Sequence, residues 1–165
     1  MCIYFHASNL YFRVGQPYSI NDFDGECTYD HNNIPESQQL INIQLDNERP
    51  DGVLSRTKCI YLFGSLVHCF AYARYNNIAH IYEVHVDGNV FGPYPMTLVS
   101  TVYKCPADNR PDVIREYWHQ TNRWKVLEYL TLSIIVEREI PIENRWYNRD
   151  DYEDDRLLSQ KIFNY

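Results

Sequence analysis

Three short apolar runs, far apart in the chain, each carry one polar residue where a buried strand would normally have none. They are residues 3–8 with His6, residues 55–63 with Tyr61, and residues 124–130 with Glu128. Apolar runs of this length predict buried strands. A polar group inside such a strand costs free energy unless a partner satisfies it, and a bound ligand can be that partner. We therefore expect His6, Tyr61 and Glu128 to lie on strands and to contact a ligand.

Length and composition predict a single globular domain over residues 1–165. A chain of 165 residues is long enough to bury roughly 70% of its unfolded surface. The apolar content of 45% and the 15 tyrosines are typical of a folded protein and not of a disordered one. The net charge of −7 argues against a protein held on DNA or RNA by a broad basic face. An enzyme that touches a few nucleotides in a local groove stays open.

The cysteines predict a reducing compartment. The five residues are odd in number and have no CxxC spacing, and Cys59 and Cys69 have apolar neighbours. We expect free thiols and a cytoplasmic protein. The N-terminal residues do not have the pattern of a signal peptide, and no apolar run approaches the ~20 residues of a membrane span. An effector injected into a host would have the same features.

The order of patterns along the chain predicts an α+β fold. Strands are expected at residues 2–5, 59–63, 79–86, 97–103, 126–132 and 133–139, the last two separated by a kink or bulge. Helices are expected at 36–47, from Ser65 as N-cap, and at 112–119 with Pro111 in the first turn. Loops are expected at 16–30 and 89–95, and a turn at 47–52. Residues 144–155, within an acidic C-terminal segment at about 144–165, are expected to be solvated, as is the acidic run 150–155 in particular.

The order of His, Tyr and Glu on three strands, with a helix after the second, resembles ADP-ribosyltransferases of the His-Tyr-Glu type. That group includes diphtheria toxin, the poly-ADP-ribose polymerases and the rifamycin-inactivating transferases. Phe5-His6-Ala7-Ser8 resembles their Tyr-His-Gly-Thr opening, and residues 59–73 resemble their second motif. Glu128-Tyr129-Leu130 resembles the third motif and the Glu-Phe-Leu of DNA-modifying transferase toxins. The pattern covers roughly residues 1–140 and looks closest to an uncharacterised bacterial family with this fold.

The resemblance implies a split β-sheet core with a few short helices, and NAD+ as a substrate with no metal. Cleavage of the nicotinamide–ribose bond develops cationic charge on the ribose, which a carboxylate can stabilise, and Glu128 takes that role. Tyr61 would stack on the nicotinamide, with Tyr72 as a second face.

The remaining NAD contacts implied by the resemblance come from His6, Ser8 and Arg56. His6, with Ser8 beside it, would bind the adenosine side, and Arg56 would pair with the pyrophosphate. Each residue also has a structural interpretation, and a surface position or a structural salt bridge explains Arg56 equally well.

The resemblance also bears on the acceptor of the ADP-ribose. Arginine-modifying transferases carry Glu or Gln two residues before the catalytic Glu, where this chain has Val126, so arginine modification is disfavoured. A drug substrate is disfavoured because Asp87 lies only at the margin of the central loop, residues 88–93. We expect a macromolecular acceptor, with nucleic acid favoured over protein. Such an enzyme would be a toxin or phage-conflict effector, with an antitoxin or regulatory protein as a further partner.

Alternatives from other classes stay open. A non-catalytic NAD- or ADP-ribose-binding module would leave Glu128 without a chemical role, and RNA 2′-phosphotransferase chemistry ranks last because a paired His/Arg motif is missing. His80 and His85 lie five residues apart on one strand, on opposite faces, so shared metal ligation is disfavoured. The sequence has no Walker A or GxGxxG pattern for a nucleotide.

Overall fold

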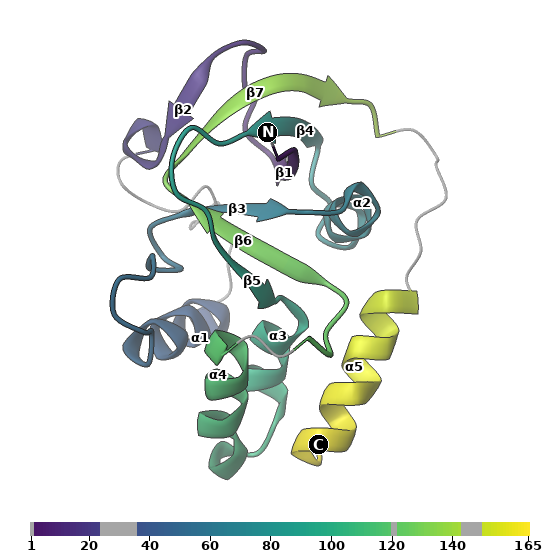
Figure 1. Ribbon diagram of the computed structural model, residues 1–165. Coiled ribbons are helices and arrows are strands. Elements are labelled where there is room, and N and C mark those ends of the chain that lie inside the picture. Colours follow the sequence, from purple (N-terminus) through teal and green to yellow (C-terminus); the bar gives the residue numbers. More distant parts are fainter. Residues whose placement is uncertain (1, 24–35, 120–121, 143–149) are drawn as a thin grey trace.

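The computed structural model describes residues 2–23, 36–119, 122–142 and 150–165. Its centre is a seven-stranded sheet in which every neighbouring pair is antiparallel (Figure 1). In sheet order the strands are β2 (Pro17–Ser19), β7 (Ser133–Ile140), β4 (His80–His85), β1 (Tyr4–Ser8), β3 (Ile60–Phe63), β6 (Leu127–Thr131) and β5 (Phe91–Pro95). The fold is therefore α+β, as the sequence predicts.

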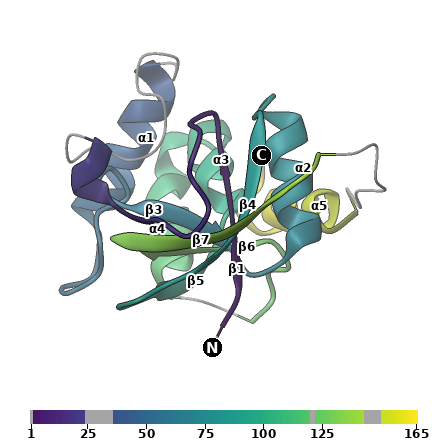
Figure 2. The same ribbon diagram turned by 90° about the horizontal axis from the view of Figure 1, so that it is seen from above.

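The helices of the described residues gather on one side of the strands (Figure 2). They are α1 (Glu36–Asn47), α2 (Leu66–Tyr75), α3 (Thr97–Lys104), α4 (Arg110–His119) and α5 (Asp150–Phe163), with short 3-10 turns at Ile20–Phe23 and Ala107–Asn109. Helix α2 packs on β1, β3 and β4, whereas α3 contacts α1, α4 and α5.

The alternation of side chains along β3 shows how the core is divided between the two faces of the sheet. Tyr61 joins the large cluster formed with α1, α3, α4 and α5, and Phe63 joins the cluster under α2. Ile60 and Leu62 point to the opposite face, where Phe12, from the segment between β1 and β2, covers them. Both faces of β3 are thus buried, which explains its continuous apolar sequence.

Several predicted elements are confirmed by the structure. Helix α1 has the predicted bounds, and Ser65 occupies the N-cap position of α2 without a side-chain capping bond. Pro111 lies in the first turn of α4, and Leu132 separates β6 from β7. In these segments local pattern and tertiary environment agree.

The strand predicted at residues 97–103 is wrong, because this segment forms α3. The Thr- and Val-rich sequence has high strand propensity. However, Leu98, Thr101, Val102 and Cys105 follow the i, i+3, i+4, i+7 spacing, and all four are buried. Burial of this face against α1, α4 and α5 overrides the local propensity.

The loops predicted at residues 89–95 and 16–30 are also wrong in part. Residues 91–95 form edge strand β5, whose register on β6 shifts between Phe91 and Tyr94. Glycine at position 92 permits this pairing, because a Cβ there would lie 3.0 Å from the carbonyl oxygen of Glu128. Residues 17–23 form β2 and a 3-10 turn, and residues 24–30 lie outside the described residues.

The prediction of a solvated acidic segment at 150–155 is wrong in part, although Asp150, Glu153 and Asp154 are exposed. These residues begin α5, and the side chain of Asp155 is buried. Its carboxylate accepts the backbone N–H groups of Lys125 at 3.0 Å and Val126 at 2.8 Å. The acidic helix therefore anchors the segment that leads into β6.

Candidate functional site

The three strands that carry His6, Tyr61 and Glu128 are consecutive neighbours in the sheet. They are β1, β3 and β6. The register pairs Tyr61 with Leu130 and Phe63 with Glu128. Because cross-strand partners share a face, Tyr61 and Glu128 point to the same side, which α1 and α4 cover.

Glu128 lies in a buried ion pair with Arg56. One oxygen of its carboxylate, Oε1, accepts a hydrogen bond from Nη1 of Arg56 and another, at 2.7 Å, from the hydroxyl of Tyr117. Nη1 of Arg56 also donates to the Tyr117 hydroxyl, so the three groups form a triangle. Only 3% of Glu128 and 4% of Arg56 is exposed. Buried charges of this kind are tolerated only when each is paired and hydrogen-bonded.

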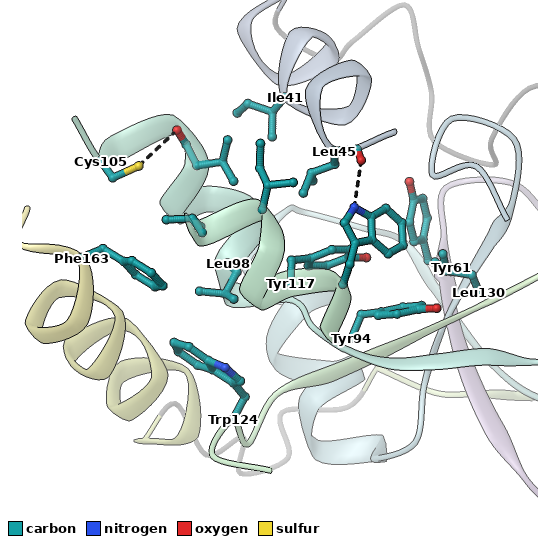
Figure 3. Close-up of a cluster of buried hydrophobic side chains, with 14 of the residues drawn as sticks. Ile41, Leu45, Tyr61, Tyr94, Leu98, Cys105, Tyr117, Trp124, Leu130 and Phe163 are labelled. Atoms are coloured by element: carbon teal, nitrogen blue, oxygen red, sulfur yellow. Dashed lines mark hydrogen bonds between the residues drawn. The ribbon is translucent and has the colours of Figure 1, made fainter. Parts of the chain in front are cut away.

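Aromatic rings surround the Arg56 guanidinium. Its Cζ lies 4.9 Å from the ring centroid of Tyr61 and 5.0 Å from that of Tyr117. The ring of Tyr94 stacks on Tyr117 at 5.3 Å, and Figure 3 shows these three tyrosines together at one end of the cluster. The Tyr61 hydroxyl donates to the backbone carbonyl of Arg56. Cation–π contacts and the ion pair together fix the guanidinium.

Helix α1 positions Arg56. The carboxylate of Asp46 accepts the backbone N–H of Arg56 at 2.7 Å and the hydroxyls of Ser55 and Thr57. The side-chain oxygen of Asn42 accepts Nε of Arg56 at 3.3 Å. These bonds hold the turn before β3 in the one orientation that directs Arg56 toward Glu128.

Arg56 keeps its charge and Tyr117 keeps its proton over the ordinary pH range. Burial by itself lowers the pKa of Arg56, but Glu128 together with the smaller effects of Tyr117, Tyr61 and Cys59 outweighs it, and the pKa lies well above its usual value. Burial raises the pKa of the Tyr117 hydroxyl well above its usual value. Arg56 therefore stays a cation and Tyr117 stays a hydrogen-bond donor.

His6 lies on β1 beside β3, with which β1 pairs only at Phe5 and Phe63. Its Nδ1–H donates to the backbone carbonyl of Tyr61 at 2.8 Å, and its ring packs edge-on against Phe12 at 5.6 Å. Burial lowers the pKa of His6 to about 4, so the ring is neutral at pH 7. Among the described residues its Nε2 has no hydrogen-bond partner. This nitrogen is a buried acceptor suited to a hydroxyl group.

Ser8 and Tyr72 lie outside the Arg56–Glu128 cluster. Ser8 pairs with His80 across β1 and β4, and its hydroxyl oxygen accepts the backbone N–H of Leu10 at 3.0 Å. Tyr72 belongs to α2 and packs on Phe63 at 5.2 Å. The structure thus joins Arg56, Tyr61 and Glu128 directly, and His6 through the backbone of β3.

The sequence analysis did not identify Tyr117, Asp46 or Asn42 as parts of this site. Tyr117 falls in a correctly predicted helix, but its position in the sequence alone does not assign it a contact with Glu128. Asp46 precedes a predicted turn, where a capping role is common, yet its partners lie nine to eleven residues away. Only the packing of α1 and α4 against β3 and β6 reveals these contacts.

The part of the chain that the structure describes has neither a membrane-spanning helix nor a cluster of metal ligands. No helix there is long and apolar enough to cross a membrane. No group of three or more His, Cys, Asp or Glu side chains in those residues could hold a metal ion.

Comparison with known proteins assigns no family to this chain. No protein-family model matches the sequence, and no curated protein matches it. The site contains a buried carboxylate held by a guanidinium and a phenol. On the opposite face of the sheet lies a neutral imidazole, that of His6, whose Nε2 has no hydrogen-bond partner among the described residues.

Proposed function

We propose that this chain is a cytoplasmic mono-ADP-ribosyltransferase that moves ADP-ribose from NAD+ to a macromolecular acceptor, on the split-sheet α+β fold of that enzyme group. The observation that carries the proposal is the placement of His6, Tyr61 and Glu128 on three neighbouring strands. Residues separated by more than 50 positions have no local reason to meet there. Their order along the chain and the adjacency of their strands agree with the resemblance, whereas the His6 ring packs with Phe12 on the face opposite Tyr61 and Glu128.

The proposed reaction breaks the bond between C1′ of the ribose and the nicotinamide nitrogen, and the nicotinamide leaves with the electron pair. A nucleophilic atom of the acceptor forms the new bond to C1′ and releases a proton. Glu128 would stabilise the positive charge on the ribose in the transition state. The neutral His6, through Nε2, would accept a hydrogen bond from a hydroxyl on the adenosine side of NAD+. Arg56, paired with Glu128, would hold that carboxylate, in place of the pyrophosphate contact expected from the sequence.

We further propose nucleic acid as the acceptor, in preference to protein. Val126, where arginine-modifying enzymes carry an acid, is completely buried at the start of β6 and offers no group to deprotonate a guanidinium. The net charge of −7 is compatible with a short single-stranded segment whose bases stack on tyrosines, because few phosphate contacts are then needed. A toxin or phage-conflict effector restrained by an antitoxin fits such an activity.

A second candidate function is a non-catalytic NAD- or ADP-ribose-binding module. The observation that favours it is the ion pair between Arg56 and Glu128, which leaves Glu128 with much of its charge compensated. In such a module the carboxylate would serve to stabilise the buried guanidinium. NAD+ turnover separates the two candidates.

The test is incubation of the protein with NAD+ labelled in the adenosine part and a cell lysate, followed by nuclease or protease. We expect label on macromolecules that nuclease removes. Glu128→Gln should lower transfer by about 10²-fold or more, the scale of a lost electrostatic stabiliser. Glu48→Gln, at an exposed position after α1, is the matched control and should transfer at the parent rate.

Each outcome has a definite meaning for the proposal. Because Glu128→Gln leaves the Arg56 charge unpaired, circular dichroism must first show the variant folded at the assay temperature. Label that only protease removes would replace nucleic acid by protein as the acceptor. Binding of NAD+ without cleavage by the parent would establish the binding module instead.

A further inference from the structure

Tyr117 occupies a central position in the cluster that the His-Tyr-Glu pattern does not assign. It lies on α4 and is completely buried. Its hydroxyl accepts a hydrogen bond from Nη1 of Arg56 and donates one to Oε1 of Glu128 at 2.7 Å. The phenol therefore links the guanidinium to the carboxylate.

The two donors around Glu128 both use the same carboxylate oxygen. Arg56 and Tyr117 converge on Oε1, whereas Oε2 accepts no hydrogen bond from any residue that the structure describes. A carboxylate with one oxygen bound to two fixed donors is restricted in both its side-chain torsions and its rotation. The arrangement leaves Oε2 as the oxygen available to another molecule.

The hydroxyl of Tyr117 is held by a rigid frame. Its ring stacks on Tyr94 at 5.3 Å and 25° and meets the neighbouring Trp118 edge-on at 4.7 Å. Trp118 donates from its indole nitrogen to the carbonyl of Leu45 at 2.9 Å, which ties α4 to α1. The same helix α1 holds the turn that carries Arg56. Both donors are thus fixed relative to each other.

We propose that Tyr117 is a positioning residue of the transferase site: it fixes Oε1 of Glu128 so that Oε2 faces the ribose of NAD+ during cleavage of the nicotinamide bond. This proposal rests on the proposed function. Tyr117 would then act on the transition state through Glu128. A misplaced catalytic carboxylate lowers transition-state stabilisation more than it weakens binding of the substrate.

The test is steady-state NAD+ cleavage by Tyr117→Phe, which keeps the ring packing and removes only the hydroxyl. We expect kcat to fall about tenfold to a hundredfold, the range for a displaced catalytic group. The KM for NAD+ should stay within about twofold, because the lost contact acts in the transition state. Tyr152→Phe is the matched control, because it also removes a hydrogen-bonded hydroxyl, which donates to the carbonyl of His68 at 2.9 Å. Its kcat should equal that of the parent.

A second comparison decides whether Tyr117 acts through Glu128. In the Glu128→Gln background, Tyr117→Phe should cause no further loss of kcat. An additional loss of the same size as in the parent would overturn the positioning role. A kcat of Tyr117→Phe equal to that of the parent would also overturn the positioning role, but it would leave the proposed function intact. A parent protein that does not cleave NAD+ would overturn both proposals, and the parent assay alone reveals that case.

Discussion

Arg56 and Glu128 show how strongly burial couples two residues that lie 72 positions apart. Each charge is almost completely removed from water, and each would be costly alone. The phenol of Tyr117, the rings of Tyr61 and Tyr117 and the side-chain oxygen of Asn42 supply further contacts of the guanidinium. Removal of either charge would therefore leave the other charge buried without its ionic partner.

His6 makes folding stability depend on pH. In the folded protein its pKa is about 4, against 6.5 for an ordinary histidine. The unfolded chain therefore takes up a proton below pH 6.5 that the folded protein takes up only near pH 4. The stabilising effect of the neutral ring is complete above pH 6.5 and is lost as the pH falls. We expect a loss of about 2 kcal/mol by pH 5 and about 3 kcal/mol in total.

Urea unfolding of the parent and of His6→Gln between pH 7.5 and pH 5 measures this effect. The variant cannot titrate at position 6, so its free energy of unfolding should fall less than that of the parent. His119→Gln, at an exposed position at the end of α4, should keep the pH dependence of the parent. Equal slopes for His6→Gln and the parent would show that His6 is not neutralised by burial.

At the scale of elements, α5 acts on the site through the start of β6. The carboxylate of Asp155 accepts backbone N–H groups of Lys125 and Val126, two residues before Glu128. Among the described residues, its neighbour Asp154 pairs only with the exposed Lys125 ammonium, at 2.8 Å. Adjacent acidic residues on one helix thus have different structural roles.

Asp155→Asn should lower the free energy of unfolding by about 1–3 kcal/mol, because an amide offers fewer acceptors to the two N–H groups. Asp154→Asn should change it by less than about 1 kcal/mol, as is usual for an exposed ion pair. Urea unfolding followed by tryptophan fluorescence provides both values. If the two variants were equally stable, α5 would not anchor β6 through Asp155.

At the scale of the whole molecule, the labelling rate of the buried cysteine thiols measures how often the folded structure opens. The four described cysteines, Cys2, Cys59, Cys69 and Cys105, are free thiols, and all but Cys2 are buried. Cys27 lies outside the described residues. Burial raises the pKa of the Cys69 and Cys105 thiols, which lowers their reactivity further.

We expect iodoacetamide to label Cys2 rapidly in the native protein and Cys59, Cys69 and Cys105 only at the rate of unfolding. In denaturant without reductant, mass spectrometry should find all five cysteines labelled. A pair that stays unlabelled until reductant is added would reveal a disulfide and contradict the reducing compartment. Rapid native labelling of Cys69 would instead show that α2 opens independently of the sheet.

The sequence by itself determined most elements and pointed to three candidate site residues. Helix α1, strand β3 and the break at Leu132 were predictable because each follows from a local pattern of apolar residues. His6, Tyr61 and Glu128 were recognisable because a polar side chain in an apolar strand is a local anomaly. The tertiary structure alone decided α3, because the burial of Leu98 and Val102 outweighs the strand propensity of the segment. It also decided the partners of Glu128, since Arg56 and Tyr117 meet the carboxylate only when α1 and α4 pack on β3 and β6, and such long-range contacts leave no signal in local sequence.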